Sequence, residues 1–453
     1  MDYTSVLEYV NSFIDFEKIS QYNYALSFKL ERIRSFLERL GNPHKAFDSV
    51  HIAGSKGKGS TCVITAHILK ESGYRVGLYT SPHLMDMRER IRVLDQGFSR
   101  GGGAESGGLG FEGAVEQEEF TRLIENIKPV AEGFRDHKEL GKLSFFEILT
   151  AVAFLYFKER RVDIAVLETG LGGRLDATNV VQPLVSGLTN ISMEHADKLG
   201  GTLSAIVKEK AGIIKAGGMV VVASQEKEVA DIIREVSRLK GAELHEIGKD
   251  IKYSITDLGK NGVVFNMEGP GYSYKDLRMN LIGFHQAENA CLAVAMVKAL
   301  PYDKYDISEE AVRNGLKKTL WPGRLHIISK APYILLDGAQ NVASVKAVLS
   351  SIKSIFDYNR LICIFGASAD KDIKGISGEL ALACDTVIVT KSRNIRAAKP
   401  AYLRENFPCS MQAIECADNL EDAMRRALEL TDKKDLILVT GSLFLVGEAL
   451  NLI

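Results

Sequence analysis

Short apolar runs alternate with longer stretches of helical spacing along most of the chain. The apolar runs cover residues 49–53, 75–79, 164–168, 184–189 and 219–223. Their nearly continuous β-branched and apolar content is typical of parallel strands that are buried on both faces. Helical stretches lie between them, most clearly over 145–160 and 287–300. The alternation predicts an α/β fold built on a doubly wound, mostly parallel sheet.

The first 45 residues show helical spacing without such runs. Leu26, Leu30, Ile33, Leu37 and Leu40 recur every three or four residues, and Gly41-Asn42-Pro43 ends the pattern. We expect this segment to be helical.

A second α/β pattern begins after Trp321-Pro322-Gly323. Apolar runs at 333–336, 361–365, 386–390 and 436–440 indicate strands with helices between them. Pro322 and Gly323 cannot continue a helix over 309–318, so we expect a hinge at 319–322. The sequence therefore predicts an N-terminal domain over 1–318 and a smaller, Rossmann-like α/β domain over 323–453.

Residues 97–113 break the pattern, because eight of these seventeen positions are glycine and few are apolar. Such a stretch loses much entropy on ordering and buries little. We interpret it as a flexible surface insertion, with a lid as the alternative. No buried strand precedes it and no lysine converges on it, so it does not resemble a phosphate loop.

Composition narrows the class of protein. A chain of 453 residues is long enough for two or three domains, and 57 basic against 58 acidic residues leave a net charge of −1. No global field then attracts nucleic acid or an acidic membrane. The chain shows no signal pattern at its start and no apolar run of about 18 residues, and its six cysteines are scattered. These features together favour a cytoplasmic protein with reduced thiols.

The strongest chemical signal is a glycine-rich turn between the run that ends at Ala53 and a helical pattern over 61–71. Glycines let backbone N–H groups converge on one point, and the helix N-terminus adds positive charge there. Lys58 supplies a full charge, and Ser60 places a hydroxyl where a phosphate-bound Mg²⁺ would sit. The predicted ATP-binding residues of this loop are Gly54, Ser55, Lys56, Gly57, Lys58, Gly59, Ser60 and Thr61.

The spacing is not that of the common P-loop. Ile52 stands where that loop has its first glycine, and Gly59 separates the lysine from the serine. A purely structural turn is the alternative interpretation. The order of strand, loop and helix favours the nucleotide site.

The variant loop and a series of further segments resemble the folylpolyglutamate synthase family, with or without dihydrofolate synthase activity, in the Mur ligase superfamily. The matching segments, in family order, are 54–60, 80–84, 88–92, 144–147, 168–179, 194–195, 209–213, 285–290, 322–324, 337–341, 370–372 and 440–443. The resemblance implies an ATP-dependent ligase that joins L-glutamate to a folate or pteroate through an acyl phosphate. Three alternatives stay open: a Mur-type ligase for another carboxylate, a P-loop ATPase without ligase activity, and an inactive relative that only binds folates.

The resemblance also implies two Mg²⁺ ions. Ser60 and Glu147 would hold the first with ATP, while Ser81 and His195 would complete the set, and Lys210 would join it as a CO₂-derived carbamate. A carbamate needs a neutral amine, and we expect burial, Lys208 and Lys215 to lower the pKa of Lys210. The predicted catalytic residues are Lys58, Glu147, His195 and Lys210. Without the resemblance, Glu147 would be a first-turn carboxylate, His195 an ordinary histidine and Lys210 a solvated helix lysine.

The remaining implied sites come from both domains. Asn289 would reach the adenine, with Arg324 and Asp337 at phosphate and ribose, and closure about 319–323 would assemble the site. The predicted substrate-binding residues are Ser81, Pro82, His83, Arg88, Arg90, Gln340 and Asp370. For the arginines a solvated helix face is the alternative.

Some positions depart from the family pattern or have a structural interpretation. The loop has Ser55 and Lys56 where the family has Thr and Asn, and Gln340 stands in place of histidine. Lys56 would lie beside the γ-phosphate or point to solvent. We expect Arg174 and Asp176 to be a structural pair that holds the loop between them, with direct catalysis as the alternative. A single chain supplies every implied site, so we expect a monomer.

Overall fold

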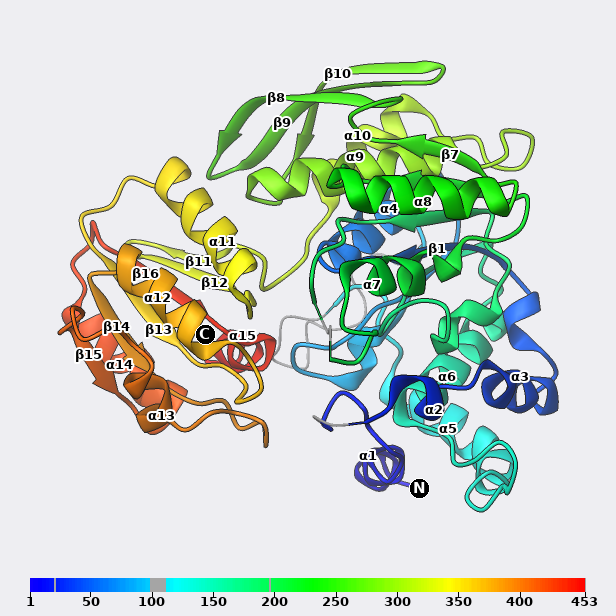
Figure 1. The fold of residues 1–453 in the computed structure, drawn as a ribbon, viewed down its shortest axis with the longest axis horizontal. Coiled ribbons are helices and arrows are strands. Elements are labelled where there is room, and N and C mark those ends of the chain that lie inside the picture. Colours follow the sequence, from blue (N-terminus) through cyan, green and yellow to red (C-terminus); the bar gives the residue numbers. More distant parts are fainter. Residues whose placement is uncertain (20–21, 98–110, 195–196, 453) are drawn as a thin grey trace.

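The computed structural model describes residues 1–19, 22–97, 111–194 and 197–452, which form two lobes (Figure 1). The larger lobe contains a seven-stranded sheet in the order β3-β2-β4-β1-β5-β6-β7. Its strands are β1 (Asp48–Ala53), β2 (Val76–Tyr79), β3 (Ile91–Leu94), β4 (Ile164–Glu168), β5 (Val185–Leu188), β6 (Met219–Val222) and β7 (Glu243–Glu246). β3 pairs antiparallel with β2, and the other neighbours pair in parallel. The predicted mostly parallel sheet is confirmed.

Helices cover both faces of this sheet. One face carries α4 (Lys58–Glu71), α9 (Phe284–Lys298) and α10 (Glu309–Lys318), which share a core with β1, β4 and β5. The opposite face carries α1 (Tyr3–Asn11), α3 (Leu30–Arg39), α5 (Gln117–Glu132), α6 (Phe145–Glu159), α7 (Leu203–Lys210) and α8 (Lys227–Leu239). Short turns complete the lobe: α2 (Tyr24–Ser27), η1 (Pro43–Lys45), η2 (Met87–Arg90), η3 (Ala177–Val180) and η4 (Ala211–Ile213).

A small antiparallel sheet extends the core beyond α9. Its strands β8 (Lys252–Gly259), β9 (Gly262–Gly269) and β10 (Tyr272–Met279) are ordered β10-β9-β8 and lie at the top of Figure 1. Val263, Phe265 and Met267 of β9 are buried in the same cluster as α4 and α9. This sheet therefore belongs to the larger lobe.

The smaller lobe is a six-stranded sheet in the order β11-β12-β16-β13-β14-β15, with only the β11–β12 pairing antiparallel. Its strands are β11 (His326–Lys330), β12 (Tyr333–Asp337), β13 (Leu361–Phe365), β14 (Thr386–Val389), β15 (Ile414–Cys416) and β16 (Leu436–Thr440). Helices α11 (Val342–Ile355), α12 (Ile373–Ala383) and α13 (Pro400–Glu405) pack on one side, and α14 (Leu420–Leu430) and α15 (Leu443–Leu450) on the other. A second α/β unit is confirmed.

The N-terminal segment is helical, but its pattern is interrupted. Phe28 and Lys29 are extended, so α2 and α3 are separate, and Leu26 is 72% exposed. Phe28 turns inward to pack on Phe16 and Tyr24, with ring centroids 5.0 and 4.8 Å away. The expectation of one continuous apolar face from Leu26 to Leu40 is wrong because this aromatic packing breaks the helix.

The structure bears only in part on the predicted insertion at 97–113 and on the predicted hinge at 319–322. Of the insertion at 97–113, residues 98–110 lie outside the described part of the chain. Between the lobes, α10 ends at Lys318 and β11 begins at His326, a gap that contains the predicted hinge. No helix within the described residues is long and apolar enough to cross a membrane.

Candidate functional site

The glycine-rich turn has a backbone that only glycine accepts at two positions. Gly54 has φ +153°, and a Cβ there would lie 1.7 Å from Thr189 Oγ1. Gly57 has φ +86°, and a Cβ there would lie 2.2 Å from Asn289 Oδ1. The turn therefore packs directly on β5 and α9 while α4 begins at Lys58, whose Nζ donates to the Gly54 carbonyl at 3.2 Å. This is the geometry of an anion-binding loop at a helix N-terminus.

The turn opens into a cavity of about 540 Å³ that both lobes line. The larger lobe contributes the loop residues 54–60 together with Ser81, Pro82, Glu168, Lys210 and Asn289, and the smaller lobe contributes Arg324, Asp337, Gln340 and Asp370. Most of the predicted site residues therefore lie around one space. Thr61, His83, Arg88, Arg90 and Glu147 do not line it, and His195 lies outside the described residues.

Glu168 is a cavity residue to which the sequence analysis assigned no role. It ends β4, directly beside Ile52 of β1 in the sheet register, and is 4% exposed. Its Oε2 accepts a hydrogen bond from the Ser81 N–H at 3.0 Å. Burial raises the pKa of Glu168, and the Lys58 ammonium opposes that rise. A carboxylate, the Ser60 hydroxyl and the Ser81 segment thus meet at the carboxyl edge of the sheet, where ligands bind in open α/β folds.

Lys210 is buried at the same edge. It is 3% exposed, and its Nζ donates to the Gly54 carbonyl at 2.7 Å. Burial and then the Lys58 charge lower the pKa of Lys210 to about 7. The direction agrees with our expectation, but the main neighbouring charges are those of Lys58, Glu194, Lys56 and Asp176 and not those of Lys208 and Lys215. A large fraction of the Lys210 amine is therefore neutral at neutral pH.

Two family models match the chain: the Mur ligase middle domain over residues 135–297 and the Mur ligase, glutamate ligase domain over residues 323–443. The dihydrofolate synthase/folylpolyglutamate synthase of Bacillus subtilis is 33% identical over 421 residues, covering 92% of this chain and 93% of that protein. The chain belongs to the folylpolyglutamate synthase/dihydrofolate synthase family.

Solved structures of this family have the same fold. Folylpolyglutamate synthase from Thermotoga maritima is 34% identical, with a TM-score of 0.82 over 98% of this chain and 95% of that one. Escherichia coli FolC in complex with DHPP and ADP is 28% identical, with a TM-score of 0.83 over 100% of this chain and 97% of that one.

The structure contradicts the assignment of Glu147 as a metal ligand. Glu147 is the third residue of α6 and forms a capping box with Ser144, accepting from its N–H at 2.7 Å and its hydroxyl at 2.8 Å. The Arg32 Nε donates to both carboxylate oxygens, at 2.8 and 3.0 Å. The carboxylate is thus held inside the lobe, away from the cavity, by a buried arginine.

The predicted arginine wall is also absent from the cavity. Arg90 is 1% exposed, and its two Nη atoms donate to Glu17 at 2.7 Å each, while its Nε donates to the Nδ1 of His83 at 2.9 Å. Arg88 pairs with Asp86. Burial and then the Arg90 charge lower the pKa of His83 to about 3. Arg90 and His83 therefore fix the chain after Ser81-Pro82, and neither a substrate wall nor a solvated face describes them.

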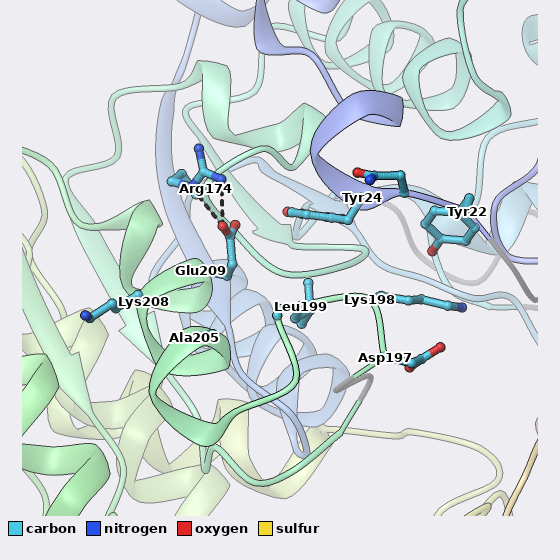
Figure 2. A pocket seen from close by; sticks show the side chains of 11 residues that line it. Tyr22, Tyr24, Arg174, Asp197, Lys198, Leu199, Ala205, Lys208 and Glu209 are labelled. Carbon is cyan, nitrogen blue, oxygen red and sulfur yellow. Dashed lines mark hydrogen bonds and ion pairs between the residues drawn. The ribbon is translucent and has the colours of Figure 1, made fainter.

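The loop after β4 is held by Asp176 without help from Arg174. Asp176 accepts from the N–H groups of Gly170 at 2.9 Å and Leu171 at 3.0 Å. Arg174 instead donates to Glu209 at 2.7 Å, beside a second pocket of about 640 Å³ (Figure 2). The expected Arg174–Asp176 pair is wrong because Arg174 points away from the loop.

The residues expected at the nucleotide, Asn289, Arg324 and Asp337, line the cavity, and hydrogen bonds hold Asn289 and Asp337 in place. Asn289 lies on α9 and donates to Gln286 Oε1 at 3.0 Å, which orients its amide. Asp337 ends β12 and accepts from the N–H groups of Leu325 and Ala339, both at 2.8 Å. Burial raises the pKa of Asp337, and the Arg324 charge opposes the rise. The Asp337 carboxylate thus shapes the turn that presents Arg324.

The departures from the family pattern line the cavity from both lobes. Ser55 donates its hydroxyl to the Ser192 carbonyl at 3.1 Å, and Lys56 forms an ion pair with Glu194. The Lys56 side chain therefore does not extend freely into solvent, and beside the phosphate position its charge is paired with that of Glu194. Gln340 lines the cavity from the smaller lobe.

Proposed function

We propose that this chain is an ATP-dependent ligase that joins L-glutamate to a carboxylate of a folate. One observation carries the proposal: the Lys58 loop, Glu168 and Lys210 of one lobe and Arg324, Gln340 and Asp370 of the other line a single cavity. The family membership and the relatives' names support the same activity. A machine that only hydrolyses ATP needs no second lobe of polar groups facing its phosphate loop.

The chemistry follows from the charges. A carboxylate oxygen of the folate attacks the γ-phosphorus of ATP, and the bond between that phosphorus and the bridging β-phosphate oxygen breaks. ADP departs, and the folate carboxylate has become an acyl phosphate. The amine of glutamate then attacks the acyl carbon, phosphate leaves, and the nitrogen loses a proton. Two anions must meet in the first step, and Lys58 with the N–H groups of the loop offsets their repulsion.

The residues present fit a magnesium-assisted reaction. The Ser60 hydroxyl, the Glu168 carboxylate and Ser81 line the cavity beside the loop, and hard cations take such oxygen ligands. We propose that these residues, with His195 and a carbamate formed on Lys210, hold Mg²⁺ with the triphosphate. The bound ion would neutralise phosphate charge; Glu168 replaces Glu147 in this set.

We propose that the acceptor's ring and the amine substrate bind to different residues of the cavity lining. Phe16, Tyr22 and Phe28 pack together with ring centroids 4.7 to 5.9 Å apart, and Phe146 also lines the cavity. These aromatic side chains suit a flat ring such as a pterin. Gln340 and Asp370 of the smaller lobe suit the carboxylate and the ammonium of glutamate; Arg396 contacts both Asp370 and the Glu17 carbonyl, so Asp370 lies beside the aromatic cluster. Because one chain supplies both sets of residues, we propose that the monomer is active.

ADP release with ATP and Mg²⁺ tests the function when glutamate and either tetrahydrofolate or dihydropteroate are omitted in turn. The ligase requires both organic substrates, and mass spectrometry should find the acceptor extended by one glutamate. ADP release that is independent of both would establish an ATPase instead. If neither acceptor is turned over, a ligase for another acid is favoured. If folate binds but is not turned over, the chain is an inactive relative.

Two variants connect the activity to the loop. Lys58→Ala should lower kcat by at least about 10²-fold, because it removes a charge that stabilises the transferring phosphoryl group. Lys210→Ala should also lose activity and should regain part of it with short carboxylic acids, which restore an oxygen ligand. Failure of the acids to rescue Lys210→Ala would remove the carbamate from the proposal without affecting Lys58.

A further inference from the structure

Lys56 departs from the family pattern, and the structure gives its side chain a partner that also reaches the smaller lobe. Lys56 lies in the phosphate loop, where its Nζ forms an ion pair with Oε1 of Glu194. The Nδ2 of Asn341 donates to the same oxygen at 3.3 Å. One carboxylate oxygen therefore joins the phosphate loop of one lobe to the first helix of the other.

Both ends of this connection are rigidly held. On the larger lobe, the Ser55 N–H donates to the Asn190 carbonyl at 2.9 Å, and the Ser192 N–H donates to the Ser55 hydroxyl at 3.1 Å. These bonds fasten the loop to the 190–194 segment that carries Glu194. On the smaller lobe, Asn341 is the N-cap of α11, and its Oδ1 accepts from the Ser344 N–H at 3.0 Å.

The capping role fixes which way the Asn341 amide faces. Its oxygen is committed to the helix, so its NH₂ group points out of the lobe toward Glu194. The residue before it, Gln340, lines the cavity. The Asn341–Glu194 contact therefore lies next to a residue of the cavity lining.

Lys56 and Glu194 form a partly buried charge pair at this junction. The side chains of Lys56 and Glu194 are 33% and 17% exposed, so the carboxylate is partly removed from water. Burial lowers the pKa of Lys56, the Glu194 carboxylate opposes that shift, and the Lys58 and Lys371 charges add to it. An asparagine at position 56 would leave Glu194 without this partner and weaken its hold on Asn341.

We propose that Lys56, Glu194 and Asn341 form a clasp between the lobes, in which Lys56 is a positioning residue for the incoming amine substrate. Lys56 orients the Glu194 carboxylate, Glu194 accepts from Asn341, and the start of α11 is thereby held over the phosphate loop. The clasp rests on the proposed function, since it positions the lobe that would bind glutamate.

The test compares Lys56→Asn and Lys56→Arg with the parent enzyme. Lys56→Asn should raise the KM for glutamate about three- to tenfold and change kcat less than about twofold, consistent with a partly exposed charge pair at an interface. Lys56→Arg, which keeps the charge, should restore most of the affinity. The Kd for ADP, measured by calorimetry, should change by a smaller factor than the glutamate KM in both variants.

Asn341 supplies the matched control. Asn341→Ser keeps a good helix cap but cannot reach Glu194, and Asn341→Asp keeps the cap while placing a second carboxylate against it. The glutamate KM should rise with Asn341→Ser and rise further with Asn341→Asp. In the double variant Lys56→Asn/Asn341→Ser the two effects should not add, because both remove the same contact.

Small-angle scattering gives a readout that does not depend on turnover. The clasp predicts a larger radius of gyration for Lys56→Asn and Asn341→Asp than for the parent chain. Unchanged glutamate KM and unchanged radius in both variants would overturn the clasp. A collapse of ADP affinity in Lys56→Asn with an unaltered glutamate KM would overturn it too, and would make Lys56 a phosphate ligand. A parent chain that does not bind ADP would instead refute the proposed function.

Discussion

Replacing Glu147 by glutamine separates a structural carboxylate from a metal ligand. The Glu147→Gln variant would preserve the capping box with Ser144, since glutamine also serves at that position, but would lose the negative charge. Arg32 would then remain buried without its counter-ion, because the two side chains are only 7% and 6% exposed. Breaking such a pair by removing one partner costs about 3–5 kcal/mol.

The remaining contacts place the expected value within that range. Arg32 keeps a hydrogen bond from Nη2 to the Ser27 carbonyl at 2.9 Å, whereas its Nη1 contact with the Leu140 carbonyl is long, at 3.4 Å. We therefore expect Glu147→Gln to lower the free energy of unfolding by about 3 kcal/mol. The double variant Arg32→Met/Glu147→Gln, which leaves no unpaired charge, should recover most of the loss.

Urea unfolding followed by Trp321 fluorescence measures this loss. Trp321 is the single tryptophan and packs against the core that contains α4, so it reports on the larger lobe. Calorimetric binding of ADP with Mg²⁺ runs in parallel and should be unchanged in the folded variant. Unaltered stability together with lost Mg²⁺-dependent nucleotide binding would refute the reasoning and return Glu147 to the metal site.

Three further changes test other parts of the site and the core. Glu168→Gln should lower kcat by at least about 10²-fold with little loss of ADP affinity in the absence of Mg²⁺, and activity near that of the parent chain would remove Glu168 from the proposed metal set. The pKa of Lys210 falls from 10.5 in the unfolded chain to about 7 in the folded chain, so between these pH values the folded chain binds fewer protons. The free energy of unfolding should therefore rise from pH 7 to 10 in CO₂-free buffer. Lys210→Met should make that rise smaller, and an identical slope in both proteins would contradict the assigned pKa. Gly315→Ala should destabilise the chain by about 1–3 kcal/mol, although alanine has the better helix propensity, because the added Cβ would lie 2.5 Å from the Cα of Ile68. If thermal unfolding shows equal or greater stability for the variant, α4 and α10 move apart at little cost in free energy.

The phosphate loop and most strands could be predicted because their signals are local. An apolar run, a glycine-rich turn and a helix follow one another within about twenty residues around Lys58, and the structure reproduces that order in β1 and α4. Seven strands of the described part of the chain were missed: β3, β7, β8, β9, β10, β11 and β15. In β8 and β10 many side chains are exposed and polar, so no apolar run marks them.

The choice between Glu147 and Glu168 shows where the sequence analysis failed. The family segments contain both carboxylates, and the sequence analysis assigned Glu147, which does not line the cavity. The Ser144-x-x-Glu147 spacing is itself a capping-box signature, and Glu168 ends a strand that was predicted, at the edge of the sheet where ligands bind. Both signals were available. The partner Arg32, which is 115 residues from Glu147 in the chain, was not, because only the tertiary fold brings the two together.

The contacts of Lys56 and Arg90 lie beyond what spacing predicts. Each pairs with a carboxylate far along the chain, Lys56 with Glu194 and Arg90 with Glu17. A charged residue in a sequence motif indicates which chemistry a loop can support. Whether that side chain contacts a ligand or stabilises the fold depends on its partner, which spacing along the chain does not predict.

The central claim is that the acceptor's carboxylate is activated by the γ-phosphoryl group of ATP before the amine attacks. An acceptor labelled with ¹⁸O in its reacting carboxylate, followed by ³¹P NMR of the released phosphate, tests it most directly. The account predicts one ¹⁸O atom in each phosphate formed with ATP, Mg²⁺ and glutamate. Phosphate that carries no label from the acceptor, while the amide product forms, would contradict it.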